Sequence, residues 1–257
     1  MPTGTLYWHE GMEGWKPVIE WLGERPSQGS LVVAPVPQVQ AFSFTVDPTG
    51  LTQFLQGLLW VSVAVACLAL IIDLEELIHV HLGQLTPDQI AGYDPMQGTV
   101  GWLQAGLGLL TGIVFLKWIY RAYKNIQGFG AEGLRFTPAW AVGYYFIPVL
   151  SLVRPVQVMS EIWRASQDPR NWLKRRSSWL IGAWWCLFLL CSISTQVSLE
   201  LAFDSSTNDQ WLLAAILATV GDFFSIPLSI VALRLVTMIY QQQKSLVERD
   251  PEDNFPG

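Results

Sequence analysis

The sequence predicts an all-α membrane protein with four transmembrane helices, both termini in the cytoplasm, and a basic cytoplasmic loop that contains a re-entrant or interfacial helical segment. Three observations predict this fold. Apolar residues make up 51% of the 257 residues and charged residues only 14%, against about 25% charged in an average soluble domain. Four apolar runs are long enough to cross a bilayer. Ten of the fifteen Lys and Arg residues lie in one stretch, residues 117–179.

Residues 1–24 form a small piece ahead of the first apolar run. Its sequence predicts a short strand, a turn at Glu10 and Gly11, and a helix that begins near Met12. One group of residues resembles the C-terminal half of the bacterial variant of the GYF domain: Trp8, Gly11, Met12, Trp15, Lys16 and Pro17. The full domain would imply peptide binding, but the half that carries further ligand-contacting aromatic residues has no counterpart here. We therefore expect a remnant, or a start codon upstream of Met1.

Two further polar segments flank the membrane domain. Residues 25–50 hold Pro26, Pro35, Pro37 and Pro48 among Ser, Gln and Gly, which favours an extended linker. Residues 241–257 are predicted to form a polar cytoplasmic tail. Residues 51–240 between them are the predicted four-span membrane domain.

The four predicted spans are Phe54–Ile72, Val100–Ile119, Trp179–Leu199 and Trp211–Met238. The first contains nineteen uncharged residues, and a helix of that length nearly matches the hydrocarbon core of roughly 30 Å. The second carries small residues at helical spacing, namely Gly101, Ala105, Gly108 and Gly112. Such a stripe lets another helix approach closely.

The charges of the connecting loops predict the topology. Residues 73–98, between spans one and two, hold acidic residues and no Lys or Arg. The basic residues lie at or between the facing ends of spans two and three: Lys117, Arg121, Lys124, Arg135, Arg154, Arg164, Arg170, Lys174, Arg175 and Arg176. The positive-inside rule places this loop and both termini in the cytoplasm.

An apolar run inside this loop, Pro138–Met159, is flanked by basic residues on both sides and interrupted by Pro148 and Pro155. A full crossing would place basic groups outside and invert the flanking spans. A re-entrant or interfacial segment avoids both problems, because irregular backbone at membrane depth is tolerated where protein buries it. A fifth crossing is the alternative.

A long motif runs through residues 117–125 and 133–169. Its members are Arg121, Asn125, Pro138, Trp140, Pro148, Arg154, Pro155, Glu161, Trp163 and Arg164. The pattern resembles the family called domain of unknown function 4328, with weaker likeness over residues 51–240. The resemblance implies a bacterial multi-span membrane protein, sometimes preceded by a GYF-like or Pro-rich segment. It implies no activity.

Asp222 is the main candidate for chemistry within the membrane. It lies eleven residues into span four, where a charge costs at least about 2.5–3.5 kcal/mol on insertion scales. Asp222, Ser225 and Ser229 share a small, polar helix face that should look into the bundle. The face predicts a site for an ion, a proton or a polar ligand. The structural alternative is a protonated carboxyl that is hydrogen-bonded to Ser62 or Thr111.

The basic residues of the loop predict contact with anionic lipid of the inner leaflet. Lys117, Lys124, Lys174, Arg175 and Arg176 accompany Trp118, Trp163, Trp172 and Trp179 in sequence. A protein partner, a second copy of the chain or a nucleotide is the alternative, although no Gly-rich phosphate loop is present. The net charge of −6 argues against nucleic acid. Coupling of Arg154 to Asp222 stays open.

No cofactor, metal or catalytic set is expected. Glu75, Glu76, His79 and His81 could offer two or three metal ligands, but structural zinc sites use four, so a solvated acidic helix end is favoured. The three cysteines lie inside apolar runs, which indicates packing residues. The sequence therefore favours a non-enzymatic scaffold or regulator of membrane partners. The alternatives are a small transporter or channel component that uses Asp222, and a lipid-modifying enzyme that uses Glu161 or Asp222.

Overall fold

The computed structural model describes residues 6–8, 16–17, 42–81, 87–203 and 208–248. The chain divides into two units, Met1–Gln40 and Ala41–Gly257. In the first unit, β1 (Leu6–Tyr7) pairs antiparallel with β2 (Lys16–Pro17). The helix predicted from Met12 is therefore wrong at residues 16 and 17, because these residues pair with β1. The predicted turn lies outside the described residues.

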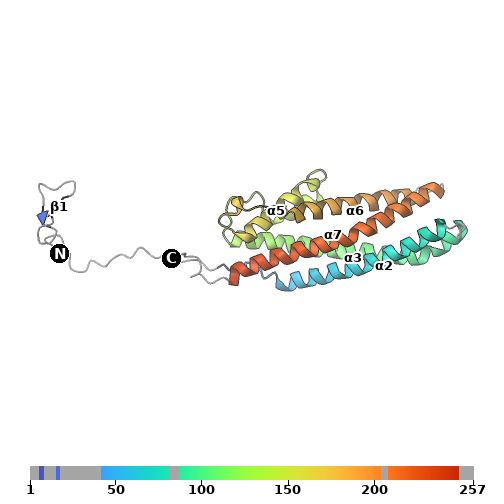
Figure 1. The fold of residues 1–257 in the computed structure, drawn as a ribbon, viewed down its shortest axis with the longest axis horizontal. Helices are drawn as coiled ribbons and strands as arrows, with labels where there is room; N and C mark the ends of the chain where they lie inside the picture. The colour runs from blue at the N-terminus through green and yellow to red at the C-terminus, as the bar shows by residue number, and fades with distance from the viewer. Residues whose placement is uncertain (1–5, 9–15, 18–41, 82–86, 204–207, 249–257) are drawn as a thin grey trace. The chain divides into compact units, whose positions relative to one another are not determined.

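Four long helices dominate the second unit (Figure 1). They are α2 (Thr49–His81), α3 (Pro87–Gly128), α6 (Trp179–Phe203) and α7 (Asn208–Glu248). Within the described residues, four helices are long and apolar enough to cross a membrane. These helices confirm the four predicted spans, and the chain is a multi-pass membrane protein with an all-helical membrane domain.

The helices extend beyond the apolar runs that predicted them. Helix α3 begins at Pro87 and α7 ends at Glu248, because helical hydrogen bonding continues through polar residues that a hydropathy pattern does not mark. Gln243 and Leu246 near the end of α7 are only 1% and 4% exposed. Residues 241–248, predicted as part of a polar tail, therefore continue a packed helix.

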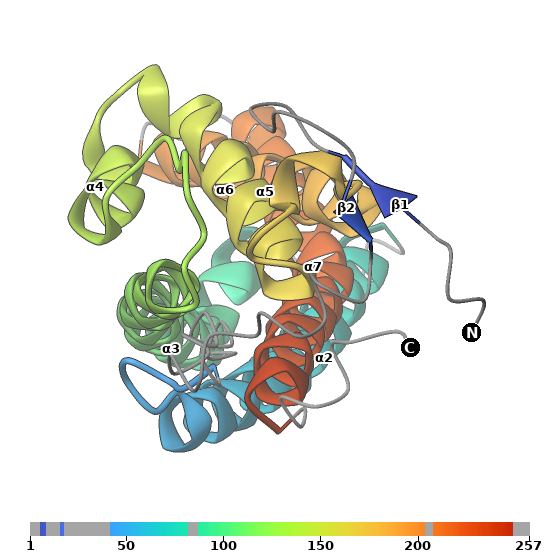
Figure 2. The same cartoon turned by 90° about the vertical axis from the view of Figure 1, so that its left-hand side faces the viewer.

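The helices pack in a fixed order. Helix α6 lies along α7, α7 along α2, and α2 along α3 (Figures 1 and 2). The backbones of α3 and α6 do not run side by side in the described part of the chain, although the Phe115 ring of α3 contacts the Trp184 ring of α6 at 5.6 Å between centroids. The bundle is therefore open between most of α3 and α6.

The joining segment breaks into short elements. Helix α4 (Pro138–Gly143) is followed by 3-10 turns η1 (Tyr144–Phe146) and η2 (Leu150–Leu152), helix α5 (Arg154–Gln167) and turn η3 (Trp172–Lys174). Pro148 and the positive φ of Val149, 67°, separate η1 from η2. No continuous fifth spanning helix occurs in this described segment. A re-entrant or interfacial placement stays a prediction.

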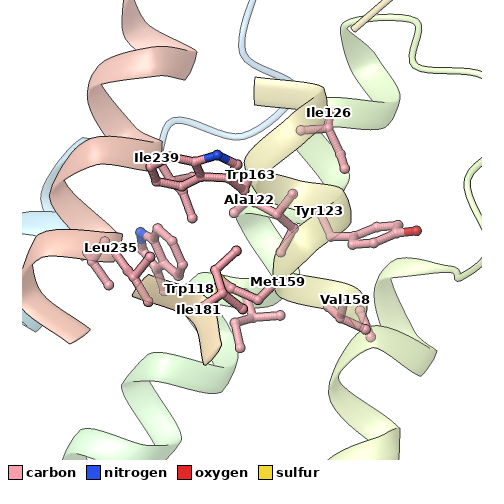
Figure 3. Close-up of a cluster of buried hydrophobic side chains, with 14 of the residues drawn as sticks. Trp118, Ala122, Tyr123, Ile126, Val158, Met159, Trp163, Ile181, Leu235 and Ile239 are labelled. Carbon is pink, nitrogen blue, oxygen red and sulfur yellow. The ribbon is translucent and has the colours of Figure 1, made fainter. Parts of the chain in front are cut away.

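Helix α5 supplies the centre of the core (Figure 3). Val158, Met159 and Ile162 are fully buried, and α5 packs against α3, α6 and α7. The surrounding side chains are Trp118, Ala122, Tyr123 and Ile126 of α3, Ile181 of α6, and Leu235 and Ile239 of α7. Burial of one such apolar side chain contributes about 1.5–3 kcal/mol to stability. Helix α5 therefore holds α3, α6 and α7 together at this end of the bundle.

Candidate functional site

A buried carboxyl lies among the motif residues at the α5 end of the bundle. Glu161 is 1% exposed, and its Oε2 accepts a hydrogen bond of 2.8 Å from the Tyr123 hydroxyl. The backbone N–H of Arg135 also donates to the carboxyl, at 3.3 Å. Burial raises the pKa of Glu161 above its ordinary value, and these hydrogen bonds offset only part of that effect. The arrangement links α3, α5 and the loop between them.

Two motif residues of α3 hold the chain that precedes α2. The Asn125 side chain exchanges two hydrogen bonds of 3.0 Å with the backbone of Val46. Arg121 donates to the backbone oxygen of Asp47 at 3.1 Å. The Asp47 carboxyl accepts the backbone N–H of Thr49, which lowers the pKa of Asp47. The part of the predicted linker that the structure describes therefore packs on α3. It belongs to the second unit, Ala41–Gly257.

Most other motif residues also have packing roles. Arg164 lies over the Trp172 ring at 5.2 Å, while Trp163 and Pro155 are buried. Pro138 opens α4, whereas Trp140 and Pro148 are exposed.

Arg154 lies apart from Asp222. Its guanidinium lies over the rings of Phe136 and Tyr144, at 5.7 Å and 5.6 Å from their centroids. It also donates to Gln157 at 2.8 Å. These contacts hold Arg154 among residues of the joining segment instead of pairing it with the acid of α7.

The basic residues divide into exposed and packed groups. Lys117, Lys174, Arg175 and Arg176 are exposed and Lys124 is half-buried. Trp179 is 76% exposed beside them. However, Trp118, Trp163 and Trp172 are at most 7% exposed, so these three rings do not accompany the basic residues at the surface. Their indole rings fill the core, where Trp118 donates to Thr52 and Trp172 to the backbone of Glu132.

An acidic cavity lies towards the other end of the bundle, away from α5. It has a volume of about 280 Å³ and is lined by residues of α2, α3, α6 and α7. Its polar lining consists of Asp73, Glu76, Gln104, Ser198, Thr219 and Asp222. The described lining contains no basic side chain. The carboxyl groups of this cavity lie between apolar helices, where a charged group needs polar partners.

Asp222 has two partners in this cavity. Gln104 Nε2 donates to Asp222 Oδ1 at 2.8 Å, and the Asp73 side chain, which lines the same cavity, interacts with Asp222. The predicted partners differ: Ser62 donates to the backbone of Leu58, and the buried Thr111 hydroxyl has no partner in the structure. The sequence did not indicate Gln104 and Asp73 as partners of Asp222. The depth of each residue in the membrane was estimated from the ends of the apolar runs, and the helices extend beyond those ends.

The two serines of the predicted polar face have different roles. Ser225 donates to the backbone oxygen of Asp222 at 2.8 Å. Ser229 is 9% exposed. Both line a second, larger cavity of about 1030 Å³ that also includes Gln104 and Asp222. Asp222, Ser225 and Ser229 therefore line one cavity.

Within the described residues, no group of three His, Cys, Asp or Glu side chains has metal-binding geometry. The side chains of His79 and His81 lie outside the described residues, so the acid–imidazole prediction is not tested. The three cysteines are free thiols, and Cys191 Sγ lies 3.7 Å from the backbone oxygen of Gly221.

Comparison with known proteins gives one match. Residues 82–241 match a family model described as "Domain of unknown function (DUF4328)". This range covers more than half of the chain and contains every motif residue named above. No curated protein and no solved structure matches the chain. The resemblance of residues 1–24 to a GYF domain stays a prediction.

Proposed function

The chain belongs to the DUF4328 family, and from the contacts of Asp222 we propose that it binds and releases a proton inside its membrane domain, as a small transporter or channel component. The proposed location is a bacterial inner membrane with both termini in the cytoplasm. This orientation is supported by the concentration of basic residues in the α3–α6 loop.

The two acids Asp73 and Asp222 carry the proposal, because both line the same small cavity and their side chains interact. A protonated carboxyl can donate a hydrogen bond to a neighbouring carboxylate, whereas two ionised carboxylates cannot bond to each other. Two neighbouring carboxylates in a poorly hydrated site also disfavour a second charge. The pair is therefore a binding site for one proton between α2 and α7.

The surroundings favour exchange of that proton. Gln104 fixes one oxygen of Asp222, and Glu76, a third acid, lines the same cavity. A polar cavity of this size has room for water molecules that relay a proton. The described lining of the cavity contains no Lys, Arg or His residue. The site thus has an exchangeable proton and a polar path beside it.

Proton flux in liposomes tests the proposal. We expect the full-length protein to carry protons down an imposed potential, measured with an internal pH dye, and Asp222→Asn to abolish the flux. Glu200→Gln is the matched control, because Glu200 is an exposed acid of α6 outside the cavity lining. Absence of flux in the unaltered protein, or equal flux in Asp222→Asn, would contradict the proposal.

Other roles predicted from the sequence stay predictions. A scaffold or regulator role rests on residues 1–50, most of which lie outside the described residues. Contact with anionic lipid is supported by the exposure of Lys117, Lys174 and Arg176. Action as a lipid-modifying enzyme through Glu161 has little support, because Tyr123 and the backbone of Arg135 occupy that carboxyl. Absence of enzymatic activity is itself untested.

A further inference from the structure

The larger cavity is a groove on the open side of the bundle. Its volume is about 1030 Å³ and its lining is mostly apolar, drawn from α2, α3, α6, α7 and η1. Pockets for small organic ligands span about 300–1,000 Å³, so the groove has room for one ligand of ordinary size. Gln104 and Asp222 line both this groove and the acidic cavity. An occupant of the groove would therefore meet Asp222, whose neighbour Asp73 lines the adjoining acidic cavity.

The glycines of α3 keep the groove open. Gly101, Gly108 and Gly112 line it, and a Cβ placed on any of them would meet no atom within 4 Å. These glycines are therefore not required for close packing against a described neighbouring helix. They leave free space beside the α3 backbone.

The groove also offers aromatic and hydroxyl groups. Tyr145, Trp184 and Phe188 line it, and aromatic faces attract cations that have lost their water. The hydroxyl oxygens of Tyr145 and Thr111 are buried without a hydrogen-bond partner in the structure. Both residues line the groove, so their hydroxyls are available to accept or donate a hydrogen bond to an occupant. The aromatic faces and the Asp222 carboxyl favour positive charge.

We propose that the groove binds a lipophilic organic cation, whose charged group reaches the Asp73–Asp222 pair and displaces its proton. This inference rests on the proposed function and names its substrate class. When the cation binds, one proton leaves the carboxyl pair for water and one positive charge replaces it, so the net charge of the site is unchanged. The apolar body of the ligand lies along the glycine face of α3.

Two other occupants fit the groove less well. A lipid acyl chain fills apolar space but leaves Asp222 and the two hydroxyls without a charged partner. The glycine face of α3 in a second copy of the chain brings no positive charge to the carboxyls. Charge complementarity therefore selects a cation over both.

Binding of tetraphenylphosphonium to the full-length protein in phosphatidylcholine nanodiscs tests the inference. We expect saturable binding that strengthens as pH rises, together with release of one proton. Tetraphenylborate, of similar shape and opposite charge, should not bind. Asp222→Asn should weaken phosphonium binding about a hundredfold, as expected when a buried charge pair loses one partner.

Two leucine variants test the location. Gly108→Leu places a side chain in the groove without a backbone clash, and should reduce binding at least about tenfold while leaving Asp222-dependent proton flux in place. Gly106→Leu is the matched control, since Gly106 is exposed on the same helix, has equally open space and does not line the groove. It should bind as the unaltered protein does.

Several outcomes would overturn the inference: equal affinity for the borate, equal loss in both leucine variants, or no loss in Gly108→Leu. Retention of lipid alone, or a dimer that Gly108→Leu disrupts without any phosphonium binding, would assign the groove to the other occupants. If proton flux depends on Asp222 but no phosphonium binds, this inference fails and the proposed function stands. If phosphonium binds without proton release and proton flux is absent, the proposed function fails, and so does the proposed exchange of a proton for the cation.

Discussion

At the scale of single residues, Glu161 shows how a carboxyl can be essential to packing without facing a substrate. Its oxygens receive the Tyr123 hydroxyl and the backbone of Arg135, and Tyr123 in turn accepts the backbone N–H of Phe136 at 3.2 Å. Removal of one partner from such a buried network leaves the others unsatisfied. Glu161 therefore positions the loop that begins the joining segment.

The raised pKa of Glu161 predicts a pH dependence of stability. Its ordinary pKa is 4.5, and a raised folded-state pKa means that the unfolded chain releases this proton first as pH rises. The contribution of Glu161 is therefore complete below pH 4.5 and is lost as pH rises through the raised pKa.

Glu161→Gln should flatten this part of the stability profile, because the amide cannot ionise. Thermal unfolding in detergent between about pH 4 and 8 measures it. Glu132→Gln, which changes an exposed acid of the same loop, should keep the slope of the unaltered protein. A slope that survives in Glu161→Gln would mean that another group causes it.

At the scale of elements, Asn125 fastens the segment before α2. Asn125→Ala removes both hydrogen bonds to Val46, each with a net contribution of about 0.5–1.5 kcal/mol. We expect a loss of about 1–3 kcal/mol and faster proteolysis within residues 42–48. Gln127→Ala, at an exposed position two residues later, should change neither. Equal proteolysis in both variants would contradict the role of Asn125.

The joining segment shows what sequence could and could not predict. The prolines and flanking charges of Pro138–Met159 indicated that this run is not a simple span. In the structure it is divided among α4, η1, η2 and the beginning of α5. Its apolar character came from two sources, however. Val158 and Met159 are buried against other helices, whereas Phe146 and Val149 are at least 73% exposed. Hydropathy cannot separate these cases, because protein and lipid are both apolar surroundings.

Labelling of introduced cysteines tests the placement of that segment. In a background with Cys67, Cys186 and Cys191 replaced by Ala, Glu132→Cys and Lys174→Cys flank α4 and α5 at exposed positions. Both should react with a non-permeant maleimide from the same side of sealed vesicles. Reaction from opposite sides would mean that the segment crosses. Ser166 is unsuitable as a label site because it is fully buried.

At the scale of the whole membrane domain, the two ends of the bundle differ in chemistry. The α5 end has exposed basic residues over a packed core, and the other end has the acidic cavity. The loop charges of the sequence indicated this asymmetry. The sequence could not predict that the backbones of α3 and α6 do not run side by side or that Gln104 contacts Asp222, since both depend on which of four helices of similar composition become neighbours.

The topology of the complete domain follows from the same asymmetry. Four crossings place Ser43, Glu132 and Gln241 on one side and Glu75 on the other, and all four positions are exposed. In the cysteine-free background, a non-permeant maleimide added to intact cells should label only Glu75→Cys. The other three variants should react only after the inner membrane is opened. Labelling of Gln241→Cys but not of Ser43→Cys on intact cells would require an odd number of crossings. Labelling of both, without Glu75→Cys, would mean that the domain is inserted the other way round and that the Asp222 cavity lies towards the cytoplasmic face.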